Sequence, residues 1–280
     1  MSQPDVRIVR IIGLVTDFGA KGHHYIASMK GVILKINPKV KIIDISHNIT
    51  PFSIIETSYV VKTTHKYYPE DTVFIVVVDP GVGSSRAIVV IKTANNQYFV
   101  GPDNGIFSNV FSPDDIVECV TVENQNYFFK PISKVFHGRD IMAPVGAYIT
   151  KNVSLNNFGP SYNPSKFVKY PLKYEVSPKN KKITCVIQYI DTFGNGTTNI
   201  PLQENRILET SIILEHGKEI VMLYKNQEYR GKFTSHFESV PPKSILFVKG
   251  SSGNLEVSIN LGNAAKEIGI ELGDEISFSF

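Results

Sequence analysis

The most apolar segment of the chain reads VFIVVV at residues 73–78, and DPGVG follows it directly at residues 79–83. An uninterrupted apolar run that ends in Asp, Pro and Gly predicts a buried strand leading into a tight turn. Ligands of open α/β sheets bind at the carboxyl ends of such strands. We therefore expect Asp79 to hold its carboxylate at the rim of a sheet, beside a polar site.

The segments on either side of this strand alternate between strand and helix patterns. Apolar strands are expected at 7–15 and 40–45, and helical spacing of apolar residues at 24–37, 54–67 and 140–150. Residues 88–91 and 98–100 have the pattern of a hairpin. Apolar strands that alternate with helices predict a mostly parallel sheet covered on both faces.

The sequence changes character in a proline-rich segment at residues 158–182. Shorter, alternating strands are expected after it, at 183–190, 206–214, 219–224, 244–248 and 255–259. This pattern is typical of a small antiparallel barrel or sandwich. We therefore predict an α/β N-terminal domain with a mostly parallel sheet, residues 1–170, followed by a small all-β, barrel-like C-terminal domain, residues 180–280.

The composition excludes several classes of protein. The net charge of +3 on 280 residues is too small to indicate nucleic-acid binding. No apolar segment approaches the roughly 20 residues that a membrane-spanning helix needs, and residues 1–10 lack the pattern of a secretory signal. The two cysteines, Cys119 and Cys185, lack metal-ligand spacing, which favours a reducing compartment. A cytoplasmic protein without membrane or nucleic-acid partners is expected.

Three polar residues of the N-terminal half are candidates for catalysis. Asp79 and Arg86 flank the glycine-rich turn, and His137 lies in the segment FHGRD at residues 136–140. An Asp, Arg and His set can hold a water molecule, accept its proton and balance charge. A structural salt bridge between Asp79 and Arg86, and a structural histidine, are the alternatives. Asp17, in TDFG at residues 16–19, either binds a ribose diol or caps a turn.

The C-terminal half contains two polar segments with binding potential. In DTFGN at residues 191–195, Phe193 offers a stacking face and Asn195 offers the donor and acceptor that an adenine edge needs. A bend in a hairpin would explain this segment equally well. Ser251 begins SSGNLE, whose hydroxyl and amide groups suit a zwitterionic ligand or an ordinary loop.

These segments occur together in a recognisable order: TDFG (16–19), DPGVG (79–83), GPDNG (101–105), FHGRD (136–140), residues 191–199 and residues 251–265. The ordered set closely resembles the S-adenosyl-L-methionine hydroxide adenosyltransferase family, which is related to the fluorinase and chlorinase enzymes. The resemblance extends over about residues 8–275. It implies an N-terminal α/β domain, a barrel-like C-terminal domain, and hydrolysis of S-adenosylmethionine to adenosine and L-methionine.

The resemblance also implies roles for individual residues. Asp79, Arg86 and His137 match the catalytic set, and Asp17 matches the carboxylate that holds the ribose hydroxyls. Phe193, Asn195 and Phe237 match the adenine side, and Asp191 and Ser251 match positions near the methionine end. The family assembles as a homotrimer, with substrate between the N-terminal domain of one subunit and the C-terminal domain of the next. S-adenosylmethionine is then the substrate, and neither a metal nor a cofactor is expected.

Two other functions are open at this point. One is a halide adenosyltransferase on the same fold. Those relatives replace the Asp, Arg and His set, and in the fluorinase a Ser contacts the halide at the position that aligns with Gly138, which disfavours halide use. The other is a non-catalytic protein that binds S-adenosylmethionine or adenosine. Whether Asp79 or His137 is the base is also open.

Overall fold

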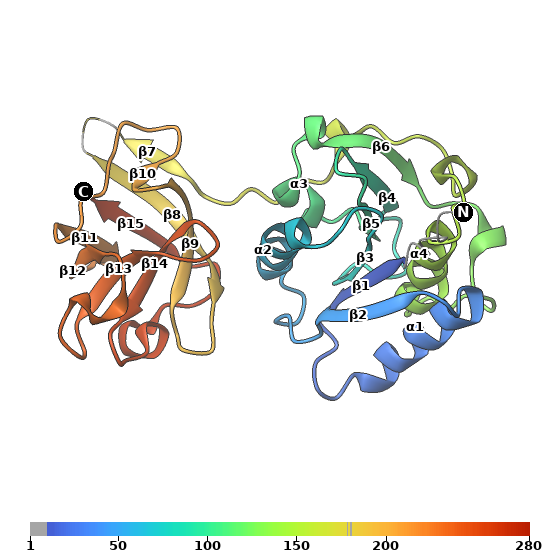
Figure 1. The fold of residues 1–280 in the computed structure, drawn as a ribbon, viewed down its shortest axis with the longest axis horizontal. Coiled ribbons are helices and arrows are strands. Elements are labelled where there is room, and N and C mark those ends of the chain that lie inside the picture. Colours follow the sequence, from blue (N-terminus) through green and yellow to red (C-terminus); the bar gives the residue numbers. More distant parts are fainter. Residues whose placement is uncertain (1–9, 178, 180) are drawn as a thin grey trace, which may run out of the picture. The chain divides into compact units, whose positions relative to one another are not determined.

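The computed structural model describes residues 10–177, 179 and 181–280. These residues form two compact units, divided between Tyr170 and Pro171. The first unit is a sheet with helices on both faces, and the second is built of strands (Figure 1). Residues 7–9 of the first predicted strand, and residue 180 at the predicted domain start, lie outside the described residues.

The first unit contains a six-stranded sheet in the order β2-β1-β3-β5-β4-β6. Its strands are β1 (Ile11–Thr16), β2 (Lys41–Ser46), β3 (Val73–Val77), β4 (Ile88–Thr93), β5 (Tyr98–Pro102) and β6 (Ile116–Thr121). The first four in this order pair in parallel, whereas β4 is antiparallel to both β5 and β6. The predicted mostly parallel sheet and the predicted hairpin are therefore confirmed, and β6 was missed.

Alternation along β3 explains why helices cover both faces of this sheet. Val73, Ile75 and Val77 pack in a core with α1 (His23–Ile36) and α4 (Ala143–Ile149). Phe74 and Val76 pack in a second core with α2 (Ile54–Thr64) and α3 (Ile106–Val110). Figure 1 shows the two helix pairs on opposite sides of the sheet. A strand buried on both faces has no polar alternation, which is why this segment is so apolar.

The second unit is a closed barrel. Its sheet runs β10-β9-β14-β13-β12-β11-β15-β8-β7, and an additional pairing of β8 with β9 closes a ring of seven strands. The strands are β7 (Glu175–Ser177), β8 (Lys182–Ile190), β9 (Gly196–Gln203), β10 (Arg206–Ile207), β11 (Glu219–Tyr224), β12 (Gln227–Thr234), β13 (Ile245–Lys249), β14 (Asn254–Ile259) and β15 (Glu275–Ser279). The predicted barrel-like fold is confirmed. One expectation was wrong, because β12 and β13 pair in parallel rather than antiparallel.

Strand boundaries in the barrel differ from the prediction in two ways. The strand expected at residues 206–214 is only the short β10, because the chain then turns through Glu209, whose φ is 61°. The strands β7, β9, β12 and β15 were missed. In β12, Gly231 takes a buried position where an alternating strand would carry an apolar side chain, and this interrupts the pattern in the sequence.

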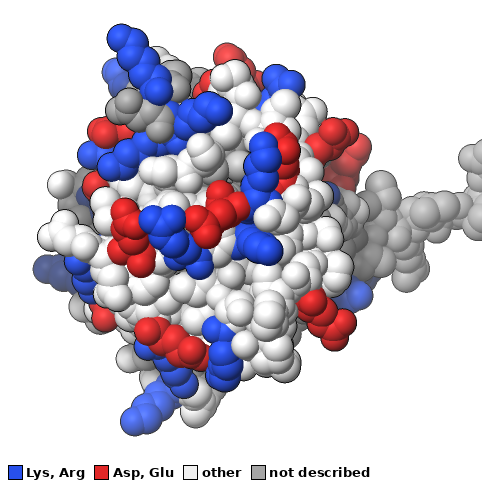
Figure 2. Space-filling model, turned by 90° about the vertical axis from the view of Figure 1, so that its left-hand side faces the viewer, with Lys and Arg blue, Asp and Glu red and all other residues white. Residues whose placement is uncertain are grey.

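The surface shown in Figure 2 carries Lys and Arg side chains intermingled with Asp and Glu around an uncharged area. That face therefore has no large patch of a single charge. Among the described residues, none of the helices combines the length and apolarity that crossing a membrane requires.

Candidate active site

Asp79, predicted at the sheet rim, and Asp17 lie at the same edge of the sheet. Strands β1 and β3 pair in parallel, with Thr16 opposite Val77, so that Asp17 and Asp79 both follow the carboxyl ends of neighbouring strands. Both residues line a cavity of about 390 Å³. The other residues around it are Phe18, Tyr25, Pro51, Phe52, Val77, Val82, Val135, Phe136, His137 and Gly138.

Arg86 joins Asp79 to His137. Its Nε lies 3.0 Å from each carboxylate oxygen of Asp79, and its Nη2 makes a further short contact with Oδ2. The same Nη2 lies 3.0 Å from His137 Nδ1. The Asp79 and Arg86 side chains are only 5% and 12% exposed, so this pair is shielded from solvent. The structure thus brings the three predicted catalytic residues into one hydrogen-bonded chain.

The glycine-rich turn allows this approach. Gly83 has a φ of 80°, and a Cβ at this position would lie 2.3 Å from the carbonyl oxygen of Lys134. Any side chain here would push the turn away from the segment that carries His137. The glycines therefore serve backbone packing, as expected for a turn, and that packing holds Asp79 and Arg86 beside His137.

The contact with Arg86 defines the state of His137. A guanidinium has only donors, so Nδ1 of His137 must be the acceptor. Burial lowers the pKa of His137 below its ordinary value, and the charge of Arg86 lowers it further, against the opposing effects of Asp79 and Asp140. His137 is therefore neutral near pH 7, with its proton on Nε2.

Two residues outside the predicted set fix this arrangement. Asn104, in the segment GPDNG, donates from Nδ2 to the carbonyl of Val78 at 2.9 Å, immediately before Asp79. Asp140 is fully buried and accepts from the backbone N–H of Ser133 at 2.8 Å and from Arg139 Nε at 2.6 Å. These bonds anchor the strand end at Asp79 and the loop that presents His137.

Asp17 is held by a backbone hydrogen bond. Its Oδ2 accepts from the N–H of Phe52 at 2.9 Å. An aromatic group beside it, made of Phe18, Tyr25 and Phe136, was missed by sequence reasoning. Its ring centroids are 5.2–6.0 Å apart. Only their position next to TDFG and FHGRD could have indicated them, and together they give the cavity an apolar wall.

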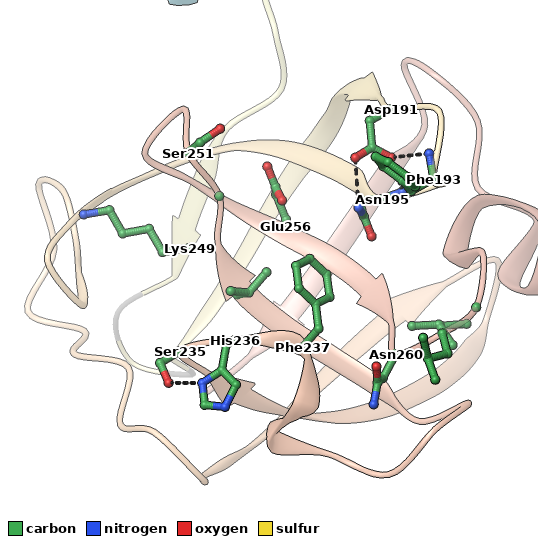
Figure 3. A pocket seen from close by; sticks show the side chains of 15 residues that line it. Asp191, Phe193, Asn195, Ser235, His236, Phe237, Lys249, Ser251, Glu256 and Asn260 are labelled. Carbon is green, nitrogen blue, oxygen red and sulfur yellow. Dashed lines mark hydrogen bonds between the residues drawn. The ribbon is translucent and has the colours of Figure 1, made fainter.

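The five residues predicted in the second unit surround a cavity of about 640 Å³ (Figure 3). They are Asp191, Phe193, Asn195, Phe237 and Ser251. Its volume is in the range of about 300–1,000 Å³ that small-molecule sites occupy. The nine predicted residues thus form two groups, one in each unit, and their roles in binding remain predictions.

Asp191 organises the turn between β8 and β9. Its Oδ1 accepts from the backbone N–H of Phe193 at 3.0 Å and of Asn195 at 2.8 Å, and its Oδ2 accepts from Asn195 Nδ2 at 2.8 Å. The side-chain amide of Asn195 keeps its oxygen and one N–H for a ligand. Phe193 is 75% exposed, so its ring face is accessible.

The barrel cavity also includes polar residues that sequence reasoning did not single out, among them Glu256, Lys249 and His236. Burial raises the pKa of Glu256, a hydrogen bond from Thr197 opposes this, and the nearby Asp191 raises it further. Alternation along β14 was the only available signal, because Glu256 lies between buried Leu255 and Val257. Within the described part of the chain, no group of three or more His, Cys, Asp or Glu residues is placed to hold a metal.

Comparison with known proteins gives a consistent result for both units. Residues 12–159 match the family described as SAM hydroxide adenosyltransferase N-terminal domain, and residues 185–277 match the corresponding C-terminal domain. A protein of Methanocaldococcus jannaschii named (R)-S-adenosyl-L-methionine hydrolase is 36% identical over 280 residues, covering 98% of this chain and 97% of its own length.

Two further similarities agree with this. A fluorinase of an Actinoplanes species is 24% identical over 213 residues, covering 68% of this chain and 71% of its own. The crystal structure of an uncharacterised conserved protein from Thermotoga maritima superposes with a TM-score of 0.86 at 36% identity, covering 96% of this chain and all of the other.

Proposed function

The chain belongs to the SAM hydroxide adenosyltransferase family, and we propose that it hydrolyses S-adenosyl-L-methionine to adenosine and L-methionine. Water attacks C5′ of the ribose, and methionine leaves as a neutral thioether. The enzyme is a hydrolase that uses S-adenosylmethionine as its substrate. The observation that carries this proposal is the hydrogen-bonded chain of Asp79, Arg86 and His137 beside the cavity that also contains Asp17.

The leaving group needs no assistance from an acid. A sulfonium departs with the bonding electrons and becomes uncharged, so no proton has to be delivered to sulfur. The nucleophile is the difficult partner, because water has a pKa of about 15.7 and must lose a proton as it attacks. Side chains must therefore orient the water and accept that proton.

Hydrogen-bond accounting distinguishes the two candidate bases. The Nδ1 of His137 accepts from Arg86, and Nε2 carries the proton, so neutral His137 presents a donor to the cavity. A carboxylate has about four acceptor sites, and Arg86 fills three of those on Asp79. Asp79 therefore retains one site for the proton of water, while His137 donates to its oxygen and Arg86 holds both partners in place.

The remaining residues position the substrate. The free oxygen of Asp17 is available to the ribose hydroxyls, and the exposed ring of Phe193, with Phe237 and Asn195, is suited to adenine. Asp191 and Ser251 serve the methionine end. Fixing the ribose relative to the water favours in-line attack, and such positioning can supply several kcal/mol of the barrier.

The direct test is an incubation of purified protein with S-adenosylmethionine, with and without chloride, followed by chromatography of the products. Adenosine and methionine in equal amounts, unaffected by chloride, are expected. Tight binding without turnover would instead support a protein that only senses the ligand. A 5′-chloro nucleoside as the main product would favour the halide reaction.

The structure offers an argument against halide use. A Cβ added at Gly138 would lie 2.8 Å from Val77 Cγ1, so a serine cannot be placed here without displacing the β3 side chain. The fluorinase relatives also match a smaller part of the chain than the hydrolases do.

The proposal includes a homotrimer, with each active site between the N-terminal domain of one subunit and the C-terminal domain of the next. Large apolar side chains around both cavities support coverage by another subunit, since Val135 is 78% and Leu261 is 77% exposed. Light scattering on the protein as it elutes from a size-exclusion column should give a molar mass of three times 31.2 kDa. A monomer at assay concentration would contradict the trimer.

We further propose a cytoplasmic location and a reaction without a metal or organic cofactor. Both cysteines are free and buried, which suits a reducing compartment. Full activity after dialysis against a chelator is the expected result, and loss of activity that zinc or magnesium restores would contradict it.

A further inference from the structure

Glu256 occupies an unusual position in the barrel wall. It lies on β14, where Leu255, Val257 and Ile259 point into the core and Glu256 points to the opposite face. Its neighbours across the sheet are Thr197 on β9 and Val248 on β13. Its carboxylate lies in the cavity between Ser251 and the turn that carries Asp191 and Asn195 (Figure 3).

The two carboxylates of this cavity differ in how many acceptor sites are occupied. Asp191 accepts three hydrogen bonds, all from its own turn. Glu256 accepts one, from the hydroxyl of Thr197 to Oε1 at 3.1 Å. Because a carboxylate can accept about four, Asp191 uses most of its acceptor sites to hold the turn, whereas Glu256 has more capacity for a ligand, above all at Oε2.

The charge of Glu256 is also uncompensated. Among the described residues, no Lys, Arg or His forms an ion pair with it, and Lys249 extends away from it in Figure 3. Its other charged neighbour in the cavity is Asp191, which has the same sign. A half-buried carboxylate in this situation gains from a cation that brings its own hydrogen-bond donors.

We propose that Glu256 recognises the α-ammonium group of the methionine part of the substrate. This inference rests on the proposed function, because S-adenosylmethionine supplies the cation. Of its two positive groups, the sulfonium has no N–H, whereas the ammonium has three donors that can reach the free Oε2. Ser251, which lines the same cavity, is then available to the carboxylate of the same amino acid.

Two ligands that differ by a single amino group provide the test. S-adenosylhomocysteine keeps the ammonium and lacks the sulfonium charge, and 5′-S-(3-carboxypropyl)-5′-thioadenosine lacks the ammonium as well. Calorimetry on the full chain should show that Glu256→Gln weakens the binding of S-adenosylhomocysteine roughly 10- to 100-fold. This is the usual effect of losing a hydrogen bond between charged groups. Binding of the deaminated ligand should change less than about threefold.

The glutamine variant keeps the side-chain shape and the acceptor for Thr197, and Glu228→Gln on the exposed face of β12 is the matched control. Equal weakening of both ligands would show that Glu256 only shapes the cavity. Unchanged affinity for S-adenosylhomocysteine would show that Glu256 does not contact the ammonium. Either result overturns the inference. Wild-type protein that binds S-adenosylhomocysteine but releases no adenosine from S-adenosylmethionine would refute the proposed hydrolysis and leave this inference intact.

Discussion

Replacing Arg86 with lysine tests the hydrogen-bonded chain while retaining the positive charge. Arg86 spans two partners, with contacts to both oxygens of Asp79 and one to Nδ1 of His137 at 3.0 Å. The single ammonium of lysine can neutralise Asp79 but cannot reproduce a planar fork that reaches both residues. Arg86→Lys should therefore leave Nδ1 of His137 without its donor and free the imidazole to rotate.

The size of the effect follows from burial. The pair is shielded from solvent, with side chains 12% and 5% exposed, so its charge-assisted hydrogen bonds are not weakened by water. Losing them should cost about 2 kcal/mol of unfolding free energy, which lowers Tm by about 4–8 °C in a domain of this size. The kcat should fall about 100-fold, as is usual when an acid–base group loses its orientation.

The assay is initial-rate release of adenosine, with KM and Tm measured on the same preparations. The KM should stay within about threefold, because Arg86 acts through Asp79 and His137 and not on the bound nucleoside. Arg230→Lys is the control, since Arg230 also bridges two carboxylates, Glu219 and Glu228, but is 57% exposed. A kcat for Arg86→Lys within threefold of wild type, at unchanged Tm, would refute the reasoning.

Four further predictions concern the same site. Gly138→Ser should lower the free energy of unfolding by about 1–3 kcal/mol, because the added side chain overpacks against Val77. The variant should form no 5′-chloro nucleoside in the presence of chloride, and a chlorinated product would contradict this. Because burial and Arg86 lower the pKa of His137, kcat/KM should stay constant as pH falls through about 6.5 and decline only below it; an acid limb above pH 7 would be inconsistent. Because the pKa of His137 is lower in the folded protein, the unfolded protein binds more protons as the pH drops below about 6.5, and His137 then destabilises the fold. The Tm of wild type should therefore fall more steeply below this pH than the Tm of His137→Gln. Asn104→Ala removes the 2.9 Å hydrogen bond to the carbonyl of Val78 at the end of β3. It should lower kcat about tenfold with little change in KM, and an equal change in kcat and KM would point to a binding role.

The strands that the sequence predicted best are those buried on both faces. β3 is apolar at every position, so no exposed side interrupts the pattern. β6 was missed because its apolar residues do not mark one face, since Val117 is 66% exposed. β12 was missed because Gly231 takes a buried position where an apolar side chain is expected. The parallel pairing of β12 with β13 could not be read from either strand, because pairing direction depends on how the barrel closes.

For the candidate site, position relative to a strand was the informative signal. Asp17 and Asp79 could be placed at a sheet rim because each follows a predicted strand. Contact between Arg86 and His137 joins residues 51 positions apart and depends on the close approach at Gly83. For Glu256 the only signal was the alternation along β14, which by itself predicts a carboxylate that points to solvent.

The origin of the oxygen in the product tests the central claim most directly. Purified protein is incubated with S-adenosylmethionine in water enriched in ¹⁸O, and the products are analysed by mass spectrometry with fragmentation of the nucleoside. Attack of water on C5′ predicts adenosine that carries one ¹⁸O at the 5′ position, together with unlabelled methionine. Unlabelled adenosine, label in methionine, or release of adenine would contradict the account.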